Sequence, residues 1–310
     1  MNVTSTDAEN LVQFKRIVEG YLLSCVCIVG LIGNSLTCLS ILLNRTRRSS
    51  PTDIFILGLS FTSIFVIAGF LLTHGIRFVF PAIGEQLHRY LFLRIFPAHV
   101  TCILIQIYLT TAISIDRCLL ICAWRTVSYR KWRTPNRIIC LICGISIFAI
   151  IYCLPFWFEY IITDDDDIEL SAIGAHPLFR ILIRKYLYFV FIFLLPMSCI
   201  TICTLSIVHT LYKLTKNRAK SHGNHYRRKK HSRQVNTLLL SIMIIFLTTQ
   251  FPYFVYNVLY ALQGPSLMEN LRARQYLSIN NLLSTINAST TFVLYALFGT
   301  KKPSNNPQSV

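Results

Sequence analysis

Two groups of charged residues in the sequence have types and spacings that suit chemistry. Asp116 and Arg117 are adjacent and follow a long apolar run, so an acid and a base can form an ion pair at its end. Four consecutive aspartates at 164–167 form the densest negative charge in the chain. An acidic run is usually a solvated loop, but it can also steer a cationic ligand through long-range electrostatics. The sequence therefore suggests ion pairing and cation recognition.

No catalytic or metal-binding set is visible in the sequence. Hydrolysis in an apolar environment needs a metal cluster, paired acids or a nucleophile with its base. Cys140 and Cys143 have the spacing of a metal or redox pair, but in an apolar helix such a pair is more often two small packing residues. We therefore expect a protein that is not an enzyme and that uses no cofactor and no metal.

The distribution of charge predicts the elements that position these residues. Charged residues make up 14% of the 310 residues, yet seven long windows contain none, and the shortest holds 21 residues. A helix needs about 20 apolar residues to cross a bilayer, whereas a membrane β-barrel shows alternating segments of about 10 residues. The sequence predicts an all-α membrane protein, a bundle of seven transmembrane helices with spans at about 20–44, 54–76, 95–115, 138–158, 186–212, 234–262 and 275–299.

The connecting segments predict how the bundle is oriented. Those on one side carry 10 basic and 11 acidic residues, and those on the other carry 20 basic and 2 acidic residues. Because Lys and Arg are retained on the cytoplasmic side, the N-terminus is expected outside. We predict an outside tail at 1–19, a membrane domain at 20–300 and a short cytoplasmic tail at 301–310. Asn2 begins an outward-facing sequon and is a predicted glycosylation site.

This topology explains the positive charge of the chain. The net charge is +17, and a basic run at 227–230 lies beside the sixth span. Juxtamembrane basic residues fix the topology and contact anionic lipid. We therefore predict membrane lipid as a partner and exclude nucleic acid, and a contribution of the run to binding an acidic cytosolic protein stays open.

Three of the predicted spans contain an interior proline, namely Pro155, Pro196 and Pro252. Each proline removes a backbone donor and kinks its helix, which a bundle tolerates when its neighbours satisfy the freed carbonyl group. All three lie in the middle or outer half of their spans. We expect the kinks to open a cavity toward the outside, where a ligand can enter.

Short motifs occur in five of the spans. They are Gly30, Gly33 and Asn34 in the first span, Asp116, Arg117 and Cys118 at the end of the third, Pro196 in the fifth, Phe246, Gln250 and Pro252 in the sixth, and Phe292, Tyr295 and Phe298 in the seventh. In order and placement they resemble the landmarks of rhodopsin-family (class A) G-protein-coupled receptors over residues 20–299. Gln250, Phe292 and the stretch 132–135 are similar to invertebrate peptide receptors of the FMRFamide-like group.

The resemblance implies a multi-pass receptor of the plasma membrane. Such a receptor binds an extracellular ligand and activates a heterotrimeric G protein on its cytoplasmic face when the sixth helix moves outward. In the family, the arginine that Arg117 matches meets the G protein, and the residues that Ile107, Pro196 and Phe246 match form a connector below the ligand pocket. We assign activation or coupling roles to Asn34, Ile107, Asp116, Arg117, Pro196, Phe246 and Tyr295.

The sequence also departs from the family pattern. Phe92 stands where the third span usually has a cysteine bonded to the second outside loop, and 159–185 contains no cysteine. We therefore expect that loop to be more mobile. Ser63 replaces an acid of the second span, which puts sodium modulation in doubt because a hard cation prefers carboxylate oxygens. Ser232 replaces an acid that locks the arginine in some members, so raised basal activity is expected.

The preferred ligand is a short basic peptide, amidated as in Arg-Phe-amide peptides. His99 stands where aminergic receptors have an aspartate, and 275–300 lacks the lysine that opsins need. A small-molecule chemosensory receptor is the alternative of the same fold, and a multi-pass transporter or channel is the alternative of another class. The candidate ligand-binding residues are the polar and aromatic residues His99, Gln106, Gln250, Tyr253, Asn257, Tyr260 and Asn281 and the acidic residues Asp164, Asp165, Asp166 and Asp167.

Overall fold

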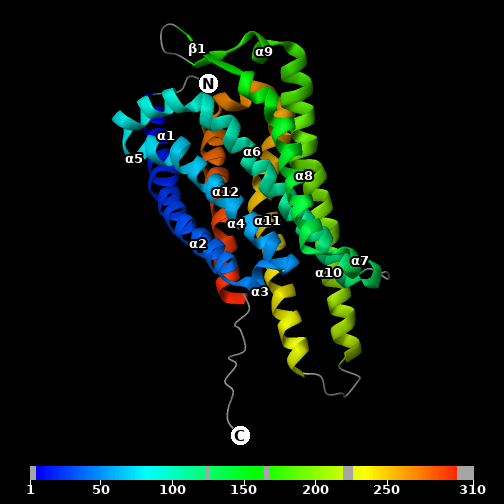
Figure 1. Ribbon diagram of the computed structural model, residues 1–310. Coiled ribbons are helices and arrows are strands. Elements are labelled where there is room, and N and C mark those ends of the chain that lie inside the picture. Colours follow the sequence, from blue (N-terminus) through cyan, green and yellow to red (C-terminus); the bar gives the residue numbers. More distant parts are fainter. Residues whose placement is uncertain (1–4, 123–125, 164–167, 219–225, 299–310) are drawn as a thin grey trace.

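A computed structural model describes residues 5–122, 126–163, 168–218 and 226–298. These residues form a bundle of long helices that lie side by side (Figure 1). A small antiparallel hairpin lies at the end that the sequence predicts to face outside. Its helices and strands are α1 (Ser5–Lys15), α2 (Leu23–Leu43), α3 (Arg45–Arg48), α4 (Pro51–Phe70), α5 (Ile76–Val79), α6 (Pro81–Cys122), α7 (Thr126–Trp132), α8 (Pro135–Cys153), β1 (Tyr160–Ile162), β2 (Ile168–Leu170), α9 (Ala172–Ala175), α10 (Leu195–Arg218), α11 (Tyr226–Gln263) and α12 (Leu271–Phe298).

Non-α helical turns connect several of these helices near the outer end. The segments Arg16–Leu22, Leu71–Gly75, Phe179–Leu187 and Phe189–Leu194 are π-helical, and Leu154–Phe158 and Gly264–Glu269 are 3-10 helices. A π-helical turn rotates the side chains that follow it relative to a regular α-helix, and such turns occur frequently at functional sites. The outer ends of the first, second and fifth spans are therefore locally irregular.

The described helices include six apolar membrane-crossing candidates and one more polar helix. By length and composition, six described segments are apolar enough to cross a membrane: Thr6–Leu43, Pro51–Val79, Leu93–Cys122, Pro135–Phe158, Phe179–Lys213 and Thr237–Tyr260. The seventh, α12, has 28 residues but is more polar. Its polar side chains Ser278, Asn280, Thr285 and Thr291 are buried, and the helix packs against α2, α4 and α11. The polar side chains of α12 thus face other helices and not lipid. For this reason the absence of charge identifies the seventh span better than mean hydropathy does.

Helix extends beyond the predicted spans at several ends, most clearly before the first and third spans. Residues 5–22, largely inside the predicted tail, are helical and continue into α2, and α6 begins at Pro81, inside the predicted loop at 77–94. A helix satisfies its own backbone hydrogen bonds both in lipid and in water. The absence of charge therefore locates the membrane-crossing part of a helix but not its ends.

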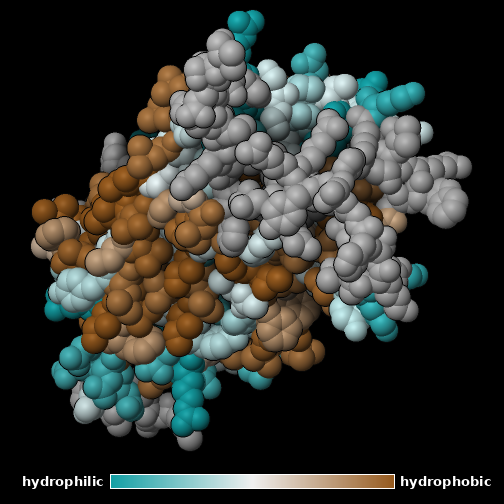
Figure 2. Space-filling view, turned by 90° about the horizontal axis from the view of Figure 1, so that it is seen from below, coloured by the Kyte–Doolittle hydropathy of each residue, from teal (hydrophilic) through white to brown (hydrophobic). Residues whose placement is uncertain are grey.

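Apolar side chains cover much of the flank of the bundle. Seen from the cytoplasmic end, apolar residues form a broad surface on one side, with hydrophilic residues at its edges (Figure 2). Ile28, Ile32 and Leu36 of α2 and Ile147 and Ile151 of α8 are large and exposed. Polar side chains such as Asn34, Ser63 and Gln106 are buried instead. This distribution suits a helix bundle surrounded by lipid.

Candidate functional site

The cytoplasmic part of α6 carries a buried ion pair. The Arg117 Nη2 lies 2.8 Å from the Asp116 Oδ2, and the two side chains are 7% and 2% exposed. This is the local pair that their adjacency predicted. An ionised side chain at this depth costs of order 3 kcal/mol unless it is paired or hydrated. The carboxylate therefore supports the buried guanidinium.

Three further residues complete this cluster, and the sequence analysis did not identify them. Arg133, between α7 and α8, donates from Nε to Asp116 Oδ1 at 2.6 Å and from Nη2 to Asp116 Oδ2 at 3.1 Å. The Tyr129 hydroxyl of α7 donates to Asp116 Oδ1 at 2.9 Å. Thr52 Oγ1 of α4 accepts from Arg117 Nη2 at 2.8 Å and from Arg133 Nη2 at 2.9 Å. We call these five residues the inner cluster.

The tyrosine of the inner cluster is a neutral donor, since an ordinary tyrosine is protonated at neutral pH and its surroundings reinforce this state. Burial, and then the charge of Asp116, raise the pKa of Tyr129 well above its ordinary value. The hydroxyl therefore stays protonated at neutral pH and remains a hydrogen-bond donor. The stretch 132–135, which contains Arg133, carries a family resemblance, but nothing in the sequence indicates that Arg133 contacts Asp116.

The predicted connector residues lie in the interior. Ile107 and Phe246 belong to one cluster of buried apolar side chains and are 4% and 3% exposed. Pro196 of α10 is also buried. A close-packed layer of this kind changes between discrete arrangements rather than deforming gradually. The layer is therefore suited to transmitting a helix shift.

Asn34 and Tyr295 fix α12 to its neighbours. The Asn34 Nδ2 donates to the Gly30 oxygen at 2.9 Å and to the Ala288 oxygen at 3.3 Å, which joins α2 to α12. The Tyr295 hydroxyl accepts a hydrogen bond from the Arg47 Nη1, and the guanidinium carbon lies 5.5 Å from the centroid of the tyrosine ring. Arg47 is a partner that the sequence motif did not indicate.

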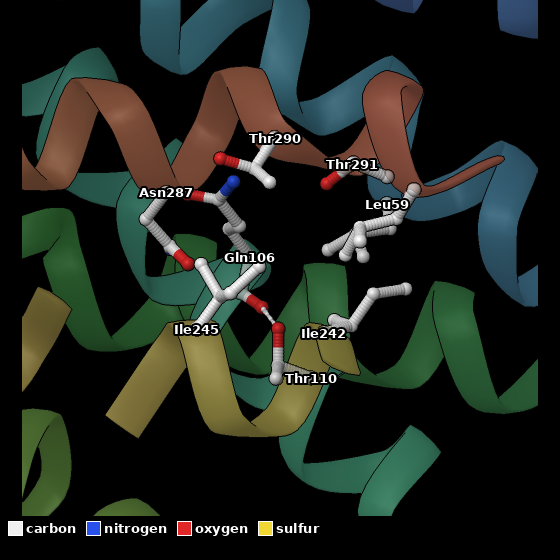
Figure 3. Close-up of a pocket in the computed structure, with 9 residues that line it drawn as sticks. Leu59, Gln106, Thr110, Ile242, Ile245, Asn287, Thr290 and Thr291 are labelled. Atoms are coloured by element: carbon white, nitrogen blue, oxygen red, sulfur yellow. Dashed lines mark hydrogen bonds between the residues drawn. The ribbon is translucent and has the colours of Figure 1, made fainter. Parts of the chain in front are cut away.

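A small pocket lies inside the bundle, between α4, α6, α11 and α12 (Figure 3). It is narrow and is lined by Leu59, Gln106, Thr110, Ile242, Ile245, Asn287, Thr290, Thr291 and Leu294. Its polar lining is neutral, which suits ordered water better than a hard cation. The Gln106 Nε2 donates to the Ser63 Oγ at 2.9 Å, so the residue that replaces the family's acid supports a predicted ligand residue.

Aromatic residues form a wall between the π-helical segment Phe189–Leu194, α11 and α12. The Tyr253 ring meets Phe193 edge-on, with ring centroids 5.2 Å apart, and stacks with Tyr256 at 6.4 Å. Tyr256 in turn stacks with Tyr276 of α12 at 6.2 Å. We call these four residues the aromatic wall. Phe193 and Tyr256 are buried, so the aromatic wall packs the outer part of α11 against its neighbours.

The other polar candidates on α11 make local contacts. The Gln250 Nε2 donates to the Ser284 Oγ of α12 at 3.4 Å. The Asn257 Nδ2 donates to the backbone oxygen of Tyr253 at 2.8 Å, and Tyr260 is half-buried. This bond within its own helix uses one of the two hydrogens on the Asn257 Nδ2.

His99 and Asn281 contact the first two spans. The His99 ring meets Phe70 edge-on at 4.5 Å, and its buried Nε2 has no hydrogen-bond partner among the described residues. The Asn281 Nδ2 donates to the Glu19 Oε1 at 2.9 Å. Glu19 is 3% exposed, although the sequence placed it in the outside tail. The structure therefore adds a buried acid beside a predicted ligand residue.

A second ion pair lies at the outer end, between a buried carboxylate and a half-buried guanidinium. Arg184 Nε lies 2.8 Å from Glu159 Oε1. The guanidinium carbon also faces three aromatic rings, with centroid distances of 5.7 Å to Phe96, 5.1 Å to Phe156 and 5.6 Å to Tyr188. We call these five residues the outer clamp. Burial raises the pKa of Glu159, and the charge of Arg184 opposes this shift.

Several predictions fall outside the described residues. They are the acidic residues Asp164, Asp165, Asp166 and Asp167, the sequon residue Asn2 and the tail at 301–310. The part of the acidic loop that is described forms the hairpin, in which Tyr160 pairs with Leu170. Within the described residues, no group of three or more His, Cys, Asp or Glu side chains could hold a metal ion.

Comparison with known proteins agrees with this architecture. The family model described as 7 transmembrane receptor (rhodopsin family) matches residues 33–295. The chain is 25% identical over 297 residues to the FMRFamide receptor of Drosophila melanogaster, which covers 92% of this chain and 52% of that receptor. It is 26% identical over 295 residues to the FMRFamide peptide receptor frpr-18 of Caenorhabditis elegans, with coverage of 89% and 65%.

A vertebrate receptor is similar over a shorter stretch. The neuropeptide Y receptor type 1 of Xenopus laevis is 27% identical over 257 residues, which covers 76% of this chain and 65% of that receptor. The matches thus span between about half and two thirds of the lengths of these three curated relatives. The predicted family resemblance is confirmed: this chain belongs to the rhodopsin family of seven-transmembrane receptors.

Proposed function

We propose that this protein is a G-protein-coupled receptor of the plasma membrane for a short basic peptide. The observation that carries the proposal is the inner cluster, in which Arg117 is held at the cytoplasmic part of α6 by one carboxylate and one hydroxyl. A buried arginine that can change partners suits a site that opens to a cytosolic protein. The bound partner is then a heterotrimeric G protein.

The interior of the bundle supplies a route from the ligand to this site. The aromatic wall lies above the buried layer of Ile107 and Phe246, and Tyr253 packs against that layer. Pro252 lies inside α11 and interrupts its hydrogen bonding. A ligand that shifts the outer part of α11 would repack the layer and move the cytoplasmic part of α11 away from α6. Arg117 would then contact the G protein.

The ligand class is supported by the relatives and by local chemistry. Two of the relatives are named as FMRFamide receptors and another as a neuropeptide Y receptor. The acidic run at 164–167 would attract a basic peptide before it binds. Amidation belongs to the proposal because an amidated peptide lacks the terminal carboxylate that this run would repel.

A small-molecule chemosensory receptor is the second candidate, and the transporter or channel reading is less favoured. The buried outer polar atoms of His99 and Glu19 would also suit a small polar ligand. A transporter would need ionisable residues paired in the middle of the membrane. The predicted spans contain no Asp, Glu, Lys or Arg, which supports a receptor.

The proposal is tested by expressing the full chain in cells and measuring calcium and cyclic AMP. The cells are exposed to a library of amidated peptides, including Phe-Met-Arg-Phe-amide, and to a panel of metabolites, at two salt concentrations. We expect a dose-dependent response to basic peptides that is stronger at low salt. Arg117→Ala should abolish the response at equal surface expression. A response only to metabolites would support the second candidate, and full signalling by Arg117→Ala would contradict the coupling mechanism.

A further inference from the structure

The carboxylate of Asp116 is shared unequally between two arginines. Arg133 contacts both carboxylate oxygens through Nε and Nη2, at 2.6 and 3.1 Å. Arg117 contacts one oxygen through Nη2 alone, at 2.8 Å. A two-point contact between a guanidinium and a carboxylate is stronger and more directional than a one-point contact. Asp116 is therefore held mainly by Arg133.

The position of Arg117 is correspondingly less satisfied. Its Nε is buried and has no hydrogen-bond partner among the described residues. Its Nη2 divides its contacts between Asp116 and Thr52, and Arg133 Nη2 donates to the same two residues. Two positive charges therefore share one negative charge and one hydroxyl oxygen. The second positive charge opposes the attraction between Asp116 and Arg117.

The segment that carries Arg133 is ordered by its own contacts. The Arg133 amide donates to the Tyr129 oxygen at 2.9 Å, and the Thr134 amide donates to the Trp132 oxygen at 2.8 Å. The rings of Tyr129 and Trp132 stack at 5.7 Å, and the Arg137 guanidinium lies 5.7 Å from the Trp132 centroid. The geometry thus presents Arg133 to Asp116 from a fixed position between α7 and α8.

We propose that Arg133 is a positioning residue that holds Asp116 and so weakens its restraint on Arg117. This inference rests on the proposed function and adds a residue that controls it. When Arg133 is present, Arg117 exchanges readily from Asp116 to a cytosolic partner. Without Arg133, Asp116 can turn both oxygens toward Arg117 and hold it more tightly. The second cytoplasmic loop would then set the ease of coupling.

The test is nucleotide exchange on a heterotrimeric G protein in membranes that contain the full receptor. Exchange is measured without ligand and with Phe-Met-Arg-Phe-amide. We expect Arg133→Gln to lower ligand-free exchange and to raise the half-maximal peptide concentration, each by about fivefold or more. Tyr129→Phe is the matched control, since it removes a neutral donor to the same Asp116 oxygen and adds no competing partner. Its effect should be smaller.

A second pair of variants separates positioning from folding. Arg133→Lys keeps the charge but loses the two-point contact, so exchange should fall between the wild type and Arg133→Gln. In an Asp116→Asn background, Arg133→Gln should have no further effect. Surface expression and the number of binding sites for labelled peptide should match the wild type for the Arg133 variants. A structural defect would lower these as well.

The outcomes distinguish this inference from the proposed function. Unchanged or increased exchange in Arg133→Gln would overturn the positioning role, and so would an equal effect of that substitution in the Asp116→Asn background. The proposed function would itself be contradicted if Arg117→Ala signalled fully. If Arg117→Ala abolishes exchange while Arg133→Gln behaves as the wild type, only the role of Arg133 fails.

Discussion

The inner cluster and the outer clamp differ in how they balance charge. The outer clamp pairs one carboxylate, Glu159, with one guanidinium, Arg184, and three aromatic rings surround the cation. The inner cluster pairs one carboxylate with two guanidinium groups. Cation–π contacts add to the outer pair without competing for the same oxygens. The outer clamp therefore suits a static contact, and the inner cluster suits exchange of partners.

The outer clamp connects three helical spans at the outer end of the bundle. Phe96 lies on α6, Phe156 follows α8, and Tyr188 lies beside the π-helical turns that precede α10. The clamp thus joins the outer ends of the third, fourth and fifth spans. In this region the chain has Phe92 where the family usually has a disulfide-bonded cysteine. The sequence therefore predicted that the second outside loop is mobile. Instead, the Ser171 amide donates to the Glu159 oxygen at 3.0 Å, which fixes the base of the loop to the clamp.

The largest expected loss of stability comes from removing the negative charge of Glu159 in the outer clamp. Glu159→Gln leaves the guanidinium of Arg184, whose side chain is 27% exposed, without a counterion, and the loss should stay below the roughly 3 kcal/mol that breaking a fully buried pair costs. Thermal unfolding of the purified receptor in detergent measures the loss. Glu169→Gln is the control, because Glu169 is an exposed acid of the same loop. Equal stability of the two variants would show that the outer clamp contributes nothing.

A smaller effect is expected from removing one ring of the outer clamp. Phe96→Leu keeps an apolar side chain but deletes the ring that faces Arg184 at 5.7 Å. The loss should be about 1 kcal/mol, the typical contribution of one cation–π contact. The same unfolding measurement applies, and Phe80→Leu is the control because Phe80 is 60% exposed. A loss as large as that of Glu159→Gln would mean that ring packing, not charge, dominates.

The smallest expected effect is that of a reducing agent. All eleven cysteines are free thiols in the structure, so the outer clamp replaces a covalent link by a charged one. Dithiothreitol should leave both the unfolding temperature and the coupling response unchanged. Raising the salt concentration should also change stability little, because a partly buried pair is poorly screened. A lower unfolding temperature with dithiothreitol would reveal a disulfide that supports the outer end.

The family landmarks were found from sequence because each is defined by its place in a span. Asn34, Asp116 and Arg117 stand at fixed depths in their helices, so their neighbours along the chain suffice to identify them. The predicted pair of Asp116 and Arg117 is present for the same reason. The environment of Gln106 is not set by any family landmark. Gln106 lies about two turns, or roughly 10 Å, below His99 and lines the interior pocket.

The sequence by itself determined the number of spans, their orientation and the family. Unpaired charge is excluded from lipid, so the spans appear directly in the distribution of charge. Within lipid, each backbone polar group must form its hydrogen bond inside the helix, so the spans are helical. The tertiary structure alone decided which partners meet. Arg133, Arg184 and Glu19 are three of many charged loop or tail residues in the sequence. Their contacts depend on how the helices rotate and pack, which no local spacing records.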